Sequence, residues 1–456
     1  MIDREPECEW LRSHLRSDDR QLLVIYGRRR VGKTTVVTHV LDQLDVPSVY
    51  YLCDQRGTAS NATRFAAQCA GTLDDVPPAV DGFADVFRYL AARTDGPFVV
   101  ALDEFSYLVE EDESIPSVFQ TITDEILAGT DISLVLLGSS ISMMEEGVLS
   151  YDSPLYGRRT GQWRLEPMTV GEAAGFFPAY SSTELVQTYS VLGGIPAYLA
   201  QFASDDSLLA NVERRILSKG EFLYEEPEFL LRQELREPAT YMGILEAIAS
   251  GASRVTEIAN EIGKDASSLS RYLKNLGQLA LVERETPVTD PDGRGVYRLT
   301  DQYLRFWFRY VFSNRSTLEQ GHTRPVLDSI VETLPTHVSQ TFEDVCQQAV
   351  RTPAFPVHCS RVGRWWYDEL EVDVAGLNES TDTLLLGECK WTAGAVGRDV
   401  LSALESIEPE VRWHGTNRSV HYALFAKAAF TDELQEVAEQ RADVSLFTAS
   451  DVLRLF

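Results

Sequence analysis

The sequence predicts a multidomain α/β protein. It is expected to begin with a parallel sheet around a phosphate-binding loop, continue through a helical lid and a winged helix-turn-helix, and end in a second α/β domain. Three observations support this prediction: a glycine-bounded loop between an apolar strand and a helix at 21–35, two helical patterns joined by a short turn at 256–285, and two strands around a polar turn at 365–391. A chain of 456 residues is too long for one ordinary core, and such a length favours about two to four domains.

The chain is strongly acidic. Its formal net charge is −28, with 69 acidic and 41 basic side chains, and lysine supplies only six of the basic ones. An acidic surface poor in lysine resembles the surfaces of proteins from salt-accumulating, halophilic archaea, where the Debye length falls to about 3 Å and like charges repel little. An acidic protein from a low-salt cell remains the alternative. In both cases the global charge does not exclude binding to nucleic acid.

Composition also narrows the compartment. No apolar run approaches the roughly 18 residues that a membrane span requires. The start of the chain, MIDREPECEW, has neither the basic region nor the apolar core of a signal peptide. The six cysteines include no CxxC pair, and His358 and Cys359 lack metal-ligand spacing. We therefore expect a cytoplasmic protein without a membrane partner and without a disulfide or zinc framework.

A phosphate-binding loop follows the first apolar strand. In QLLVIYGRRRVGKTT, Gly27, Gly32, Lys33 and Thr34 satisfy the pattern GxxxxGK[ST] in full. The glycines let backbone N–H groups point at phosphate, and the following helix N-terminus adds its dipole. We expect Lys33 to reach the β- and γ-phosphates and the Thr34 hydroxyl to ligate Mg²⁺. The residues expected to contact ATP in this loop are Gly27, Arg28, Arg29, Arg30, Val31, Gly32, Lys33, Thr34 and Thr35.

Two further apolar strands end in polar residues. PFVVALDEFSYL ends its apolar run at Asp103, which suits Mg²⁺ binding, and Glu104, which is placed to orient the attacking water. DISLVLLGSS ends in Ser139 and Ser140, where a hydroxyl either senses the γ-phosphate or only forms a turn. Ligands bind at the carboxyl edge of parallel sheets, and strands that alternate with helices predict such a sheet. The pattern therefore predicts an ATPase core.

Two later stretches are candidates for contact with the nucleotide. SPLYGRRTGQWRLEPM contains Arg158 and Arg159, and an arginine at the γ-phosphate stabilises charge in the transition state. A salt-bridged surface loop is the alternative. If Arg158 or Arg159 acts on the nucleotide of a neighbouring subunit, the protein is a homo-oligomer. LGGIPAYL, at 192–199, places a proline at the start of a helical region, where it either touches the nucleotide or connects the core to a lid.

Together, YGRRRVGKTT, ALDEFSYL, SPLYGRRTG and GGIPAYL resemble the archaeal ATPase family within the STAND/AAA-like P-loop proteins. The resemblance covers roughly residues 1–235 and implies a small helical lid after the core, with GGIP similar to the GxP signature of that lid. It implies an ATP-driven switch or motor, with ATP and Mg²⁺ as cofactors, more than a metabolic kinase.

The middle of the chain predicts a winged helix. TEIANEIGKDASSLSRYLKNLGQLALVERE contains two helices separated by a turn at Gly263, and leucines at 269, 273 and 276 form one buried face of the second helix. A recognition helix presents polar side chains to the major groove of DNA. The side chains expected on that outer face are Ser267, Ser270, Arg271 and Lys274.

A wing is expected after these helices. ETPVTDPDGRGVYRLTD, at 285–301, reads as a hairpin with DPDG at its tip. Residues 254–298 hold seven basic and seven acidic residues, a neutral stretch in an acidic chain. The pattern favours DNA as a partner, and a module that docks another protein is the alternative.

The C-terminal region predicts a helix followed by a strand pair. TFEDVCQQAV is amphipathic and carries Glu343 among its apolar residues, and WWYDELEVDVAGLNESTDTLLLGECKW predicts two strands around a turn at roughly 376–382. Side chains repeat every two residues along a strand, so Glu388 and Lys390 share a face. Hairpin pairing is expected to bring Asp373 near both.

Two carboxylates and a lysine form a recognisable chemical set. Carboxylates bind Mg²⁺ or Mn²⁺, and the metal polarises a phosphodiester and generates a nucleophilic water. Lys390 is a candidate to orient that water or help deprotonate it, because the pKa of lysine falls when the side chain is desolvated near a metal. Glu343 is a candidate for a further ligand.

This arrangement resembles the PD-(D/E)xK nuclease superfamily, which has a restriction-endonuclease-like fold, and the last 120 or so residues resemble the domain of unknown function 234. The resemblance implies metal ligands at Asp373 and Glu388, Glu343 as the acid on the helix, and Lys390 as the catalytic lysine. The first motif, EVDVAG, lacks the proline before the aspartate. A domain that keeps the fold without cleaving therefore remains an alternative.

These parts predict four domains and two main functions. The expected domains are the P-loop ATPase core at 1–175, the helical lid at 176–235, the winged helix-turn-helix and linker helix at 236–320, and the nuclease-like domain at 321–456. The first function is an ATPase that couples its nucleotide state to a DNA-bound nuclease-like domain. The second is an ATP-switched DNA-binding or scaffold protein that does not cleave, and a defence-type effector is a third, weaker option.

Overall fold

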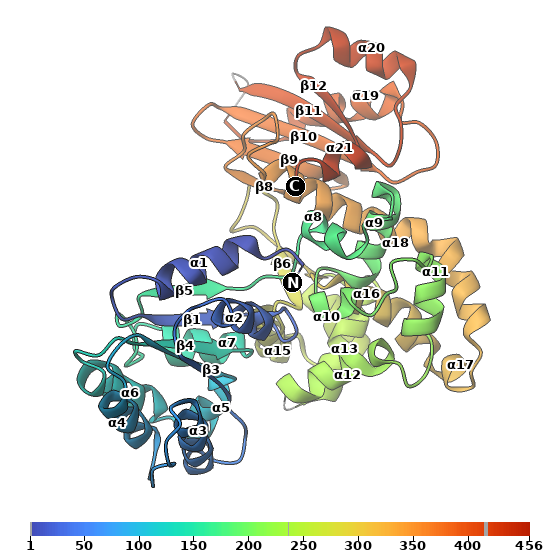
Figure 1. The fold of residues 1–456 in the computed structure, drawn as a ribbon. Coiled ribbons are helices and arrows are strands. Elements are labelled where there is room, and N and C mark those ends of the chain that lie inside the picture. The colour runs from blue at the N-terminus through green and yellow to red at the C-terminus, as the bar shows by residue number, and fades with distance from the viewer. Residues whose placement is uncertain (1, 236, 415–417) are drawn as a thin grey trace. The chain divides into compact units, whose positions relative to one another are not determined.

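The computed structural model describes residues 2–235, 237–414 and 418–456. It divides into two compact units, residues 1–167 and residues 168–456, and each is described by itself (Figure 1). Within the described part of the chain, no helix combines the length and the apolar character that crossing a bilayer requires.

The first unit is built on a parallel sheet with the strand order β2-β3-β4-β1-β5. Its strands are β1 (Leu22–Tyr26), β2 (Ser48–Leu52), β3 (Phe98–Asp103), β4 (Ile132–Gly138) and β5 (Gly161–Arg164). Its helices are α1 (Glu5–Leu15), α2 (Lys33–Leu41), α3 (Thr58–Thr72), α4 (Phe83–Arg93), α5 (Phe105–Glu111), α6 (Ile115–Thr121) and α7 (Ile141–Met143). The parallel sheet predicted from the alternating strands and helices is therefore confirmed.

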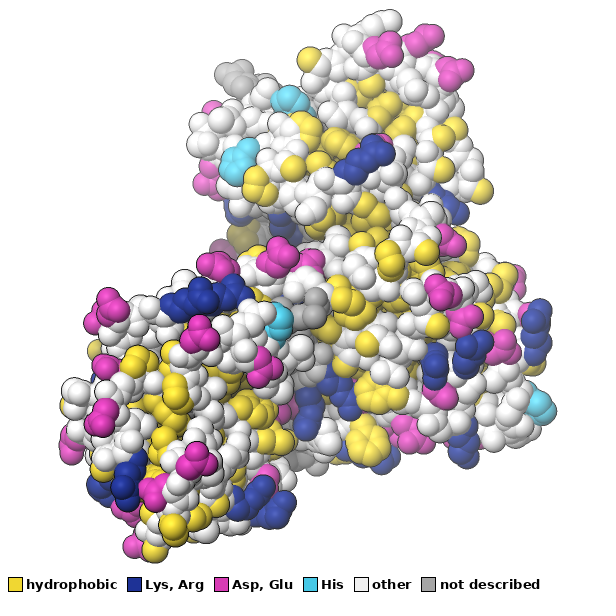
Figure 2. Space-filling model, in the orientation of Figure 1, with side chains coloured by type: hydrophobic (Ala, Val, Ile, Leu, Met, Phe, Trp, Pro, Cys, Tyr) yellow, Lys and Arg dark blue, Asp and Glu magenta, His cyan; other side chains and the backbone are white. Residues whose placement is uncertain are grey.

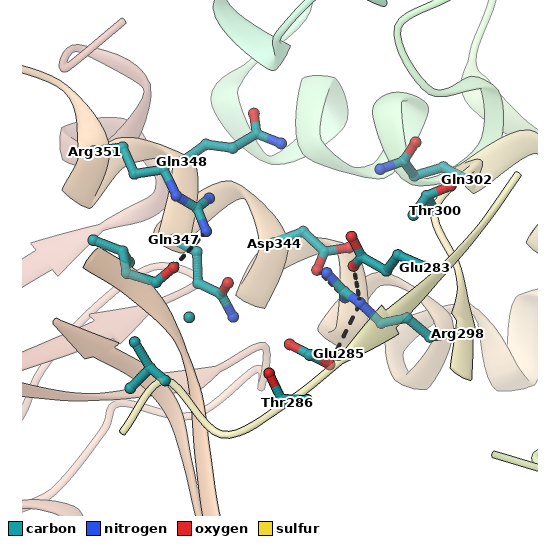
Figure 3. A pocket seen from close by; sticks show the side chains of 13 residues that line it. Glu283, Glu285, Thr286, Arg298, Thr300, Gln302, Asp344, Gln347, Gln348 and Arg351 are labelled. Atoms are coloured by element: carbon teal, nitrogen blue, oxygen red, sulfur yellow. Dashed lines mark hydrogen bonds and ion pairs between the residues drawn. The ribbon is translucent and has the colours of Figure 1, made fainter. Parts of the chain in front are cut away.

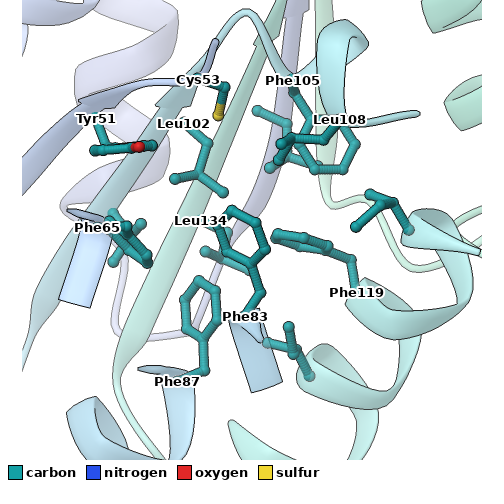
Figure 4. Close-up of a cluster of buried hydrophobic side chains, with 14 of the residues drawn as sticks. Tyr51, Cys53, Phe65, Phe83, Phe87, Leu102, Phe105, Leu108, Phe119 and Leu134 are labelled. Atoms are coloured by element: carbon teal, nitrogen blue, oxygen red, sulfur yellow. The ribbon is translucent and has the colours of Figure 1, made fainter. Parts of the chain in front are cut away.

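Apolar side chains fix this sheet. Every residue of β1, β3 and β4 is buried, as expected for parallel strands covered on both faces. On one face, α3 and α4 pack aromatic rings against the strands (Figure 4). Phe65 contacts Phe87 with ring centroids 5.7 Å apart, and Phe105 meets Phe119 edge-on at 4.8 Å. This core holds the carboxyl ends of β1, β3 and β4, which carry the polar residues of the predicted nucleotide site.

The second unit begins with a group of helices. They are α8 (Val170–Ala173), α9 (Ser182–Leu192), α10 (Pro196–Leu199), α11 (Leu208–Asn211) and α12 (Phe222–Glu234). Ser181 caps α9 through a capping box with Glu184, and Pro196 occupies the first turn of α10, where a proline is tolerated. The GGIP stretch thus ends α9 and begins α10 within the second unit.

A helix-turn-helix with a wing follows. Its helices are α13 (Pro238–Ala249), α14 (Val255–Ile262) and α15 (Ala266–Gln278), and its antiparallel wing strands are β6 (Val282–Glu285) and β7 (Val296–Leu299). The wing was expected to begin at 285, but pairing starts at Val282 opposite Leu299. Both of these apolar side chains are buried, which draws the hairpin back toward the helices.

The C-terminal sheet has the strand order β12-β11-β10-β9-β8. Its strands are β8 (Arg361–Tyr367), β9 (Leu370–Asn378), β10 (Thr383–Lys390), β11 (Ser419–Ala426) and β12 (Val444–Thr448). β8, β9 and β10 are antiparallel neighbours, whereas β10, β11 and β12 are parallel. The remaining helices of the second unit are α16 (Gln302–Phe306), α17 (Arg315–Glu319), α18 (Thr323–Arg351), α19 (Arg398–Ile407), α20 (Asp432–Gln440) and α21 (Ala449–Leu453).

Two expectations for this region need correction. The turn predicted at 376–382 is shorter, because Leu377 pairs with Leu384 and extends β9 to Asn378. The helix predicted at 341–350 is the last part of the much longer α18.

Acidic side chains lie on the exposed side of α20 (Figure 2), in keeping with the composition of the whole chain.

Candidate functional site

The phosphate-binding loop connects β1 to α2 and depends on its glycines. Gly27 has φ 150°, and a Cβ at this position would lie 2.3 Å from the backbone oxygen of Leu165. Gly32 has φ 104° and precedes Lys33, the first residue of α2. An L side chain rarely adopts either conformation. The motif therefore fixes the loop so that the N-terminus of α2 opens onto it.

Lys33 lies inside this loop. Its side chain is 6% exposed, and its Nζ donates to the carbonyl oxygens of Gly27 at 2.9 Å and Arg28 at 3.0 Å. The ammonium group thus spans the space that the loop encloses. A triphosphate in this loop would offer Lys33 charged oxygen partners in place of the neutral carbonyls, and charge-assisted hydrogen bonds of that kind are the stronger ones.

The carboxylate of Asp103 is held by three donors. Thr34 Oγ1 donates to Asp103 Oδ2 at 2.5 Å, and Tyr50 donates its phenolic O–H to the same oxygen at 2.6 Å. The backbone N–H of Glu104 donates to Oδ1 at 2.8 Å. The structure therefore brings together the hydroxyl and the carboxylate that the sequence assigned to Mg²⁺, and their oxygen atoms are the ligand type that Mg²⁺ prefers.

Glu104 lies at the end of β3 in a left-handed conformation, with φ 53°. Ser139, at the end of β4, donates its hydroxyl to Glu104 Oε2 at 2.6 Å. Ser140 instead lies 3.5 Å from Ser142, hydroxyl to hydroxyl. Ser139 thus contacts the glutamate that we expect to orient water, and its predicted role in sensing the γ-phosphate stays a prediction.

The two arginines of the SPLYGRRTG stretch have partners within the first unit. Arg158 forms an ion pair with Asp124 at 2.8 Å and donates to the carbonyl oxygen of Pro154 at 2.7 Å. The guanidinium of Arg159 lies 5.1 Å from the ring centroid of Tyr156. This geometry matches the surface-loop alternative for Arg158, which would have to leave Asp124 to reach a nucleotide.

The C-terminal site is centred on Asp373. On β8, Gly363 pairs with Ala375 of β9, and Trp365 pairs with Val372. One residue separates the two β8 positions, whereas two residues separate the two β9 positions. The extra residue is a β-bulge, which commonly re-aims a side chain. Val372 and Ala375, on either side of the bulge, lie in the same hydrophobic cluster. Asp373 Oδ2 accepts a hydrogen bond from the backbone N–H of Cys389 at 2.9 Å.

Around Asp373 lie the other three predicted residues. Lys390 Nζ contacts Glu388 Oε1 at 2.5 Å. Burial raises the pKa of Asp373 to about 6, with a further contribution from Glu388. Burial and the Asp373 carboxylate raise the pKa of Glu343 to about 8. The four residues thus form one electrostatic cluster on α18, β9 and β10.

The pKa of Lys390 is set by burial and by its ion pair with Glu388. Burial lowers this pKa, but the hydrogen bond and the charge of Glu388 outweigh burial and raise it above its ordinary value. The lowered pKa expected for Lys390 beside a metal stays a prediction, because the structure describes Lys390 in its ion pair with Glu388.

Arg364, which sequence reasoning missed, also enters this cluster. It lies on β8 and contacts Glu371 and, at 3.3 Å, Glu343 Oε2. Among the described residues, no group of three or more His, Cys, Asp or Glu side chains is positioned to hold a metal ion. The carboxylates suit Mg²⁺ or Mn²⁺ chemically, but here the cations that they contact are Arg364 and Lys390.

The predicted DNA-contacting face of α15 is exposed. Leu269, Leu273 and Leu276 are buried on its inner side. The side chains open to solvent on the outer side include Ser267, Ser270, Arg271 and Lys274. The helix therefore presents the polar residues that the sequence placed on its outer face.

The wing is docked against the C-terminal domain. The backbone N–H of Val288 donates to the carbonyl oxygen of Arg364 at 2.9 Å, so the segment between β6 and β7 covers part of the edge strand β8. On β7, Arg298 is ion-paired to Asp344 of α18 and to Glu283 of β6. A polar cavity of about 380 Å³ lies between the wing, α18 and β8 (Figure 3).

The fold and the two sites define a P-loop ATPase domain followed by a helix-turn-helix and a separate α/β domain. Residues 1–202 match the family described as an ATPase domain predominantly from Archaea. Residues 242–286 match the IclR helix-turn-helix domain, and residues 307–402 match DUF234, a family described as Archaea bacterial proteins of unknown function.

A relative extends the match across the chain. The protein is 34% identical over 396 residues to the uncharacterized protein MJECL04 of Methanocaldococcus jannaschii, an alignment that covers 86% of this chain and 87% of that protein. This chain therefore belongs to the same family as MJECL04, and its own matches are to an archaeal ATPase domain, a helix-turn-helix and DUF234. A second protein of that organism, MJ0424, is 47% identical over 60 residues, which are 13% of this chain and 58% of that protein.

Among solved structures, the Walker-type ATPase PABY2304 of Pyrococcus abyssi has a similar fold. The TM-score is 0.51 at 22% sequence identity, and the match covers 68% of this chain and 96% of that chain. At this level of identity, the likeness shows the fold alone.

Proposed function

We propose that this protein hydrolyses ATP and couples its nucleotide state to a DNA-associated, nuclease-like C-terminal domain. The observation that carries the proposal is the convergence of Lys33, Thr34, Asp103 and Glu104 at one edge of the parallel sheet. These residues supply a phosphate contact, two oxygen groups for Mg²⁺ and a carboxylate to orient water. Thr34 and Asp103 would hold Mg²⁺, which would supply positive charge to the phosphate groups.

DNA as a partner is supported by the helix-turn-helix. The exposed Arg271 and Lys274 on α15 provide positive charge for phosphate contacts, and such contacts supply most non-specific affinity for DNA. The match to a helix-turn-helix family covers this helix. Part of the wing segment is hydrogen-bonded to β8. We therefore expect α15, and not the wing, to make the main contact with DNA.

Two experiments test the proposal. ATP hydrolysis by the purified chain should require Mg²⁺ and disappear in Lys33→Ala, and absence of hydrolysis in the wild type would overturn it. A nuclease assay with Mg²⁺ or Mn²⁺ on several DNA forms, with and without ATP, tests the C-terminal domain. Cleavage should be lost in Lys390→Ala, because that variant removes the amine beside Glu388. Cleavage that survives this substitution would come from a contaminant.

A second candidate function has its own observation. Glu343 and Glu388 are paired with Arg364 and Lys390, and internal ion pairs of this kind favour a domain that binds without cleaving. In that case ATP switches a DNA-binding or scaffold protein, including one of a defence system. No cleavage of any DNA form, together with ATP-dependent DNA binding, would support this second function.

Oligomerisation is a separate part of the proposal. If Arg158 leaves Asp124 and acts on a neighbouring subunit's nucleotide, the specific ATPase activity should rise with protein concentration. Arg158→Ala should then abolish that dependence. An activity independent of concentration would assign Arg158 to the surface loop.

A further inference from the structure

Tyr50 lies at the predicted nucleotide site but has no role in the functions described above. It lies on β2, the edge strand next to β3, and its ring is neither fully buried nor fully exposed. Its hydroxyl donates to Asp103 Oδ2 at 2.6 Å. Neither the phosphate-loop motif nor the acidic strand end includes this position, because β2 reaches the site through the order of the strands.

Tyr50 is one of three hydrogen-bond donors to the Asp103 carboxylate. Thr34 approaches Oδ2 from the first turn of α2, at 2.5 Å, while Tyr50 approaches the same oxygen from β2. The backbone of Glu104 holds Oδ1. Asp103 is only 2% exposed, so an Asp103 oxygen that lost a donor would have little water to replace it. Such an unsatisfied buried acceptor is costly.

The two hydroxyl donors are not equivalent once Mg²⁺ is considered. The Thr34 hydroxyl is the group expected to ligate the metal, so it must serve both the metal and Asp103. The Tyr50 hydroxyl donates to Asp103 and is not expected to ligate the metal.

We propose that Tyr50 is a positioning residue of the nucleotide site, whose hydroxyl orients the Asp103 carboxylate for Mg²⁺ and thereby sets the metal requirement of ATP turnover. Tyr50 acts through Asp103 and does not itself contact the nucleotide. This inference rests on the proposed ATPase function and identifies a residue outside its sequence motifs.

The test compares two neighbouring tyrosines. Tyr50→Phe removes the hydroxyl and keeps the ring. Tyr51→Phe is the matched control, because Tyr51 donates to Asn61 Oδ1 at 3.0 Å and adjacent strand residues point to opposite faces. The Mg²⁺ concentration for half-maximal ATPase activity should rise about three- to tenfold in Tyr50→Phe, the effect of removing one hydrogen bond of ordinary net strength. It should be unchanged in Tyr51→Phe.

Two further measurements separate positioning from a general loss of structure. Binding of a fluorescent ATP analogue in EDTA reports the metal-free nucleotide and should be the same in Tyr50→Phe and the wild type. Mn²⁺ binding to the nucleotide complex, followed by electron paramagnetic resonance, should weaken in Tyr50→Phe. In Asp103→Asn, which takes away the carboxylate, the added Tyr50→Phe change should have little further effect on Mn²⁺ binding.

The inference is overturned if Tyr50→Phe and the wild type have the same metal requirement, or if both tyrosine variants shift it equally. It is also overturned if the effects of Asp103→Asn and Tyr50→Phe on Mn²⁺ binding simply add. A wild type that does not hydrolyse ATP would overturn the proposed function instead. The Mn²⁺ experiment would still decide the role of Tyr50, since it requires no turnover.

Discussion

Arg298 on the second wing strand is ion-paired to Asp344 near the C-terminal end of α18. Asp344 also contacts Arg305 of α16 at 3.4 Å. Burial by itself raises the pKa of Asp344, but the two arginines outweigh it and hold this pKa below its ordinary value. Glu343, the next residue back along α18, contacts Arg364. One turn of helix thus carries both the wing contact and an acid of the C-terminal site.

The first prediction concerns the stability of this docked wing. Asp344→Ala removes the carboxylate that Arg298 and Arg305 share. Arg298 keeps its pair with Glu283, but Arg305, whose side chain is 11% exposed, loses its ion pair with Asp344, and breaking a buried pair in this way costs about 3–5 kcal/mol. The free energy of unfolding, measured by urea denaturation, should fall by that order. Asp328→Ala is the control on the same helix, because its pair with Arg324 is exposed and such pairs contribute about 0–1 kcal/mol. Equal losses in the two variants would contradict the prediction.

The second prediction concerns the pH dependence that Glu343 imposes. Burial and Asp373 raise its folded-state pKa to about 8, from an ordinary value of 4.5. The folded protein therefore binds this proton more tightly than the unfolded chain, so the stability that the group contributes is present below about pH 4.5 and is lost as the pH rises toward 8. Glutamine at this position has no proton to lose.

Glu343→Gln should consequently be more stable than the wild type at pH 8, by about 2–4 kcal/mol, and the gain should shrink toward pH 5. Urea denaturation at several pH values measures it. Glu332→Gln, at an exposed position of α18, is the control and should change stability little at any pH. A Glu343→Gln variant that is less stable at pH 8 would show that the pairing with Arg364 outweighs the cost of burial.

The third prediction separates nucleotide binding from turnover. Glu104→Gln keeps the size of the side chain and its contact with Ser139 but loses the charge that polarises water. Turnover should fall by about a hundredfold or more, the usual contribution of such a group, while ATP affinity stays near that of the wild type. Steady-state ATPase assays and equilibrium binding measure the two quantities. Glu110→Gln, exposed on the nearby α5, should leave both unchanged, and a Glu104→Gln variant with normal turnover would refute the assignment.

Several residues of the two sites could be predicted from local sequence patterns. Lys33, Thr34, Asp103 and Glu104 were predictable because each follows an apolar strand within a short motif, where covalent spacing fixes the geometry. The hairpin of β9 and β10 was predictable for the same reason. Strand pairing then brought Asp373 to Glu388.

Tyr50 and Arg364 were not predictable in this way. Tyr50 reaches Asp103 only because β2 pairs with β3, and Arg364 reaches Glu343 only because β8 pairs with β9 and α18 packs nearby. Strand order is a property of the whole fold, and no local pattern encodes it. The bulge at 373–374 and the wing contact of Val288 likewise depend on partners distant in the sequence.

The last prediction concerns DNA binding by α15. Arg271 and Lys274 are exposed on its outer face, and removing one phosphate-binding cation reduces the dependence of log affinity on log salt by about 0.9. The double substitution Arg271→Ala with Lys274→Ala should therefore weaken binding to duplex DNA and lower the salt slope by about 2. Fluorescence anisotropy at several salt concentrations measures both. Arg324→Ala, exposed on α18 outside the helix-turn-helix, is the control for loss of positive charge. If the double variant and the wild type bind DNA with the same affinity and salt slope, α15 does not contact DNA phosphates, and the helix-turn-helix instead serves to dock another protein.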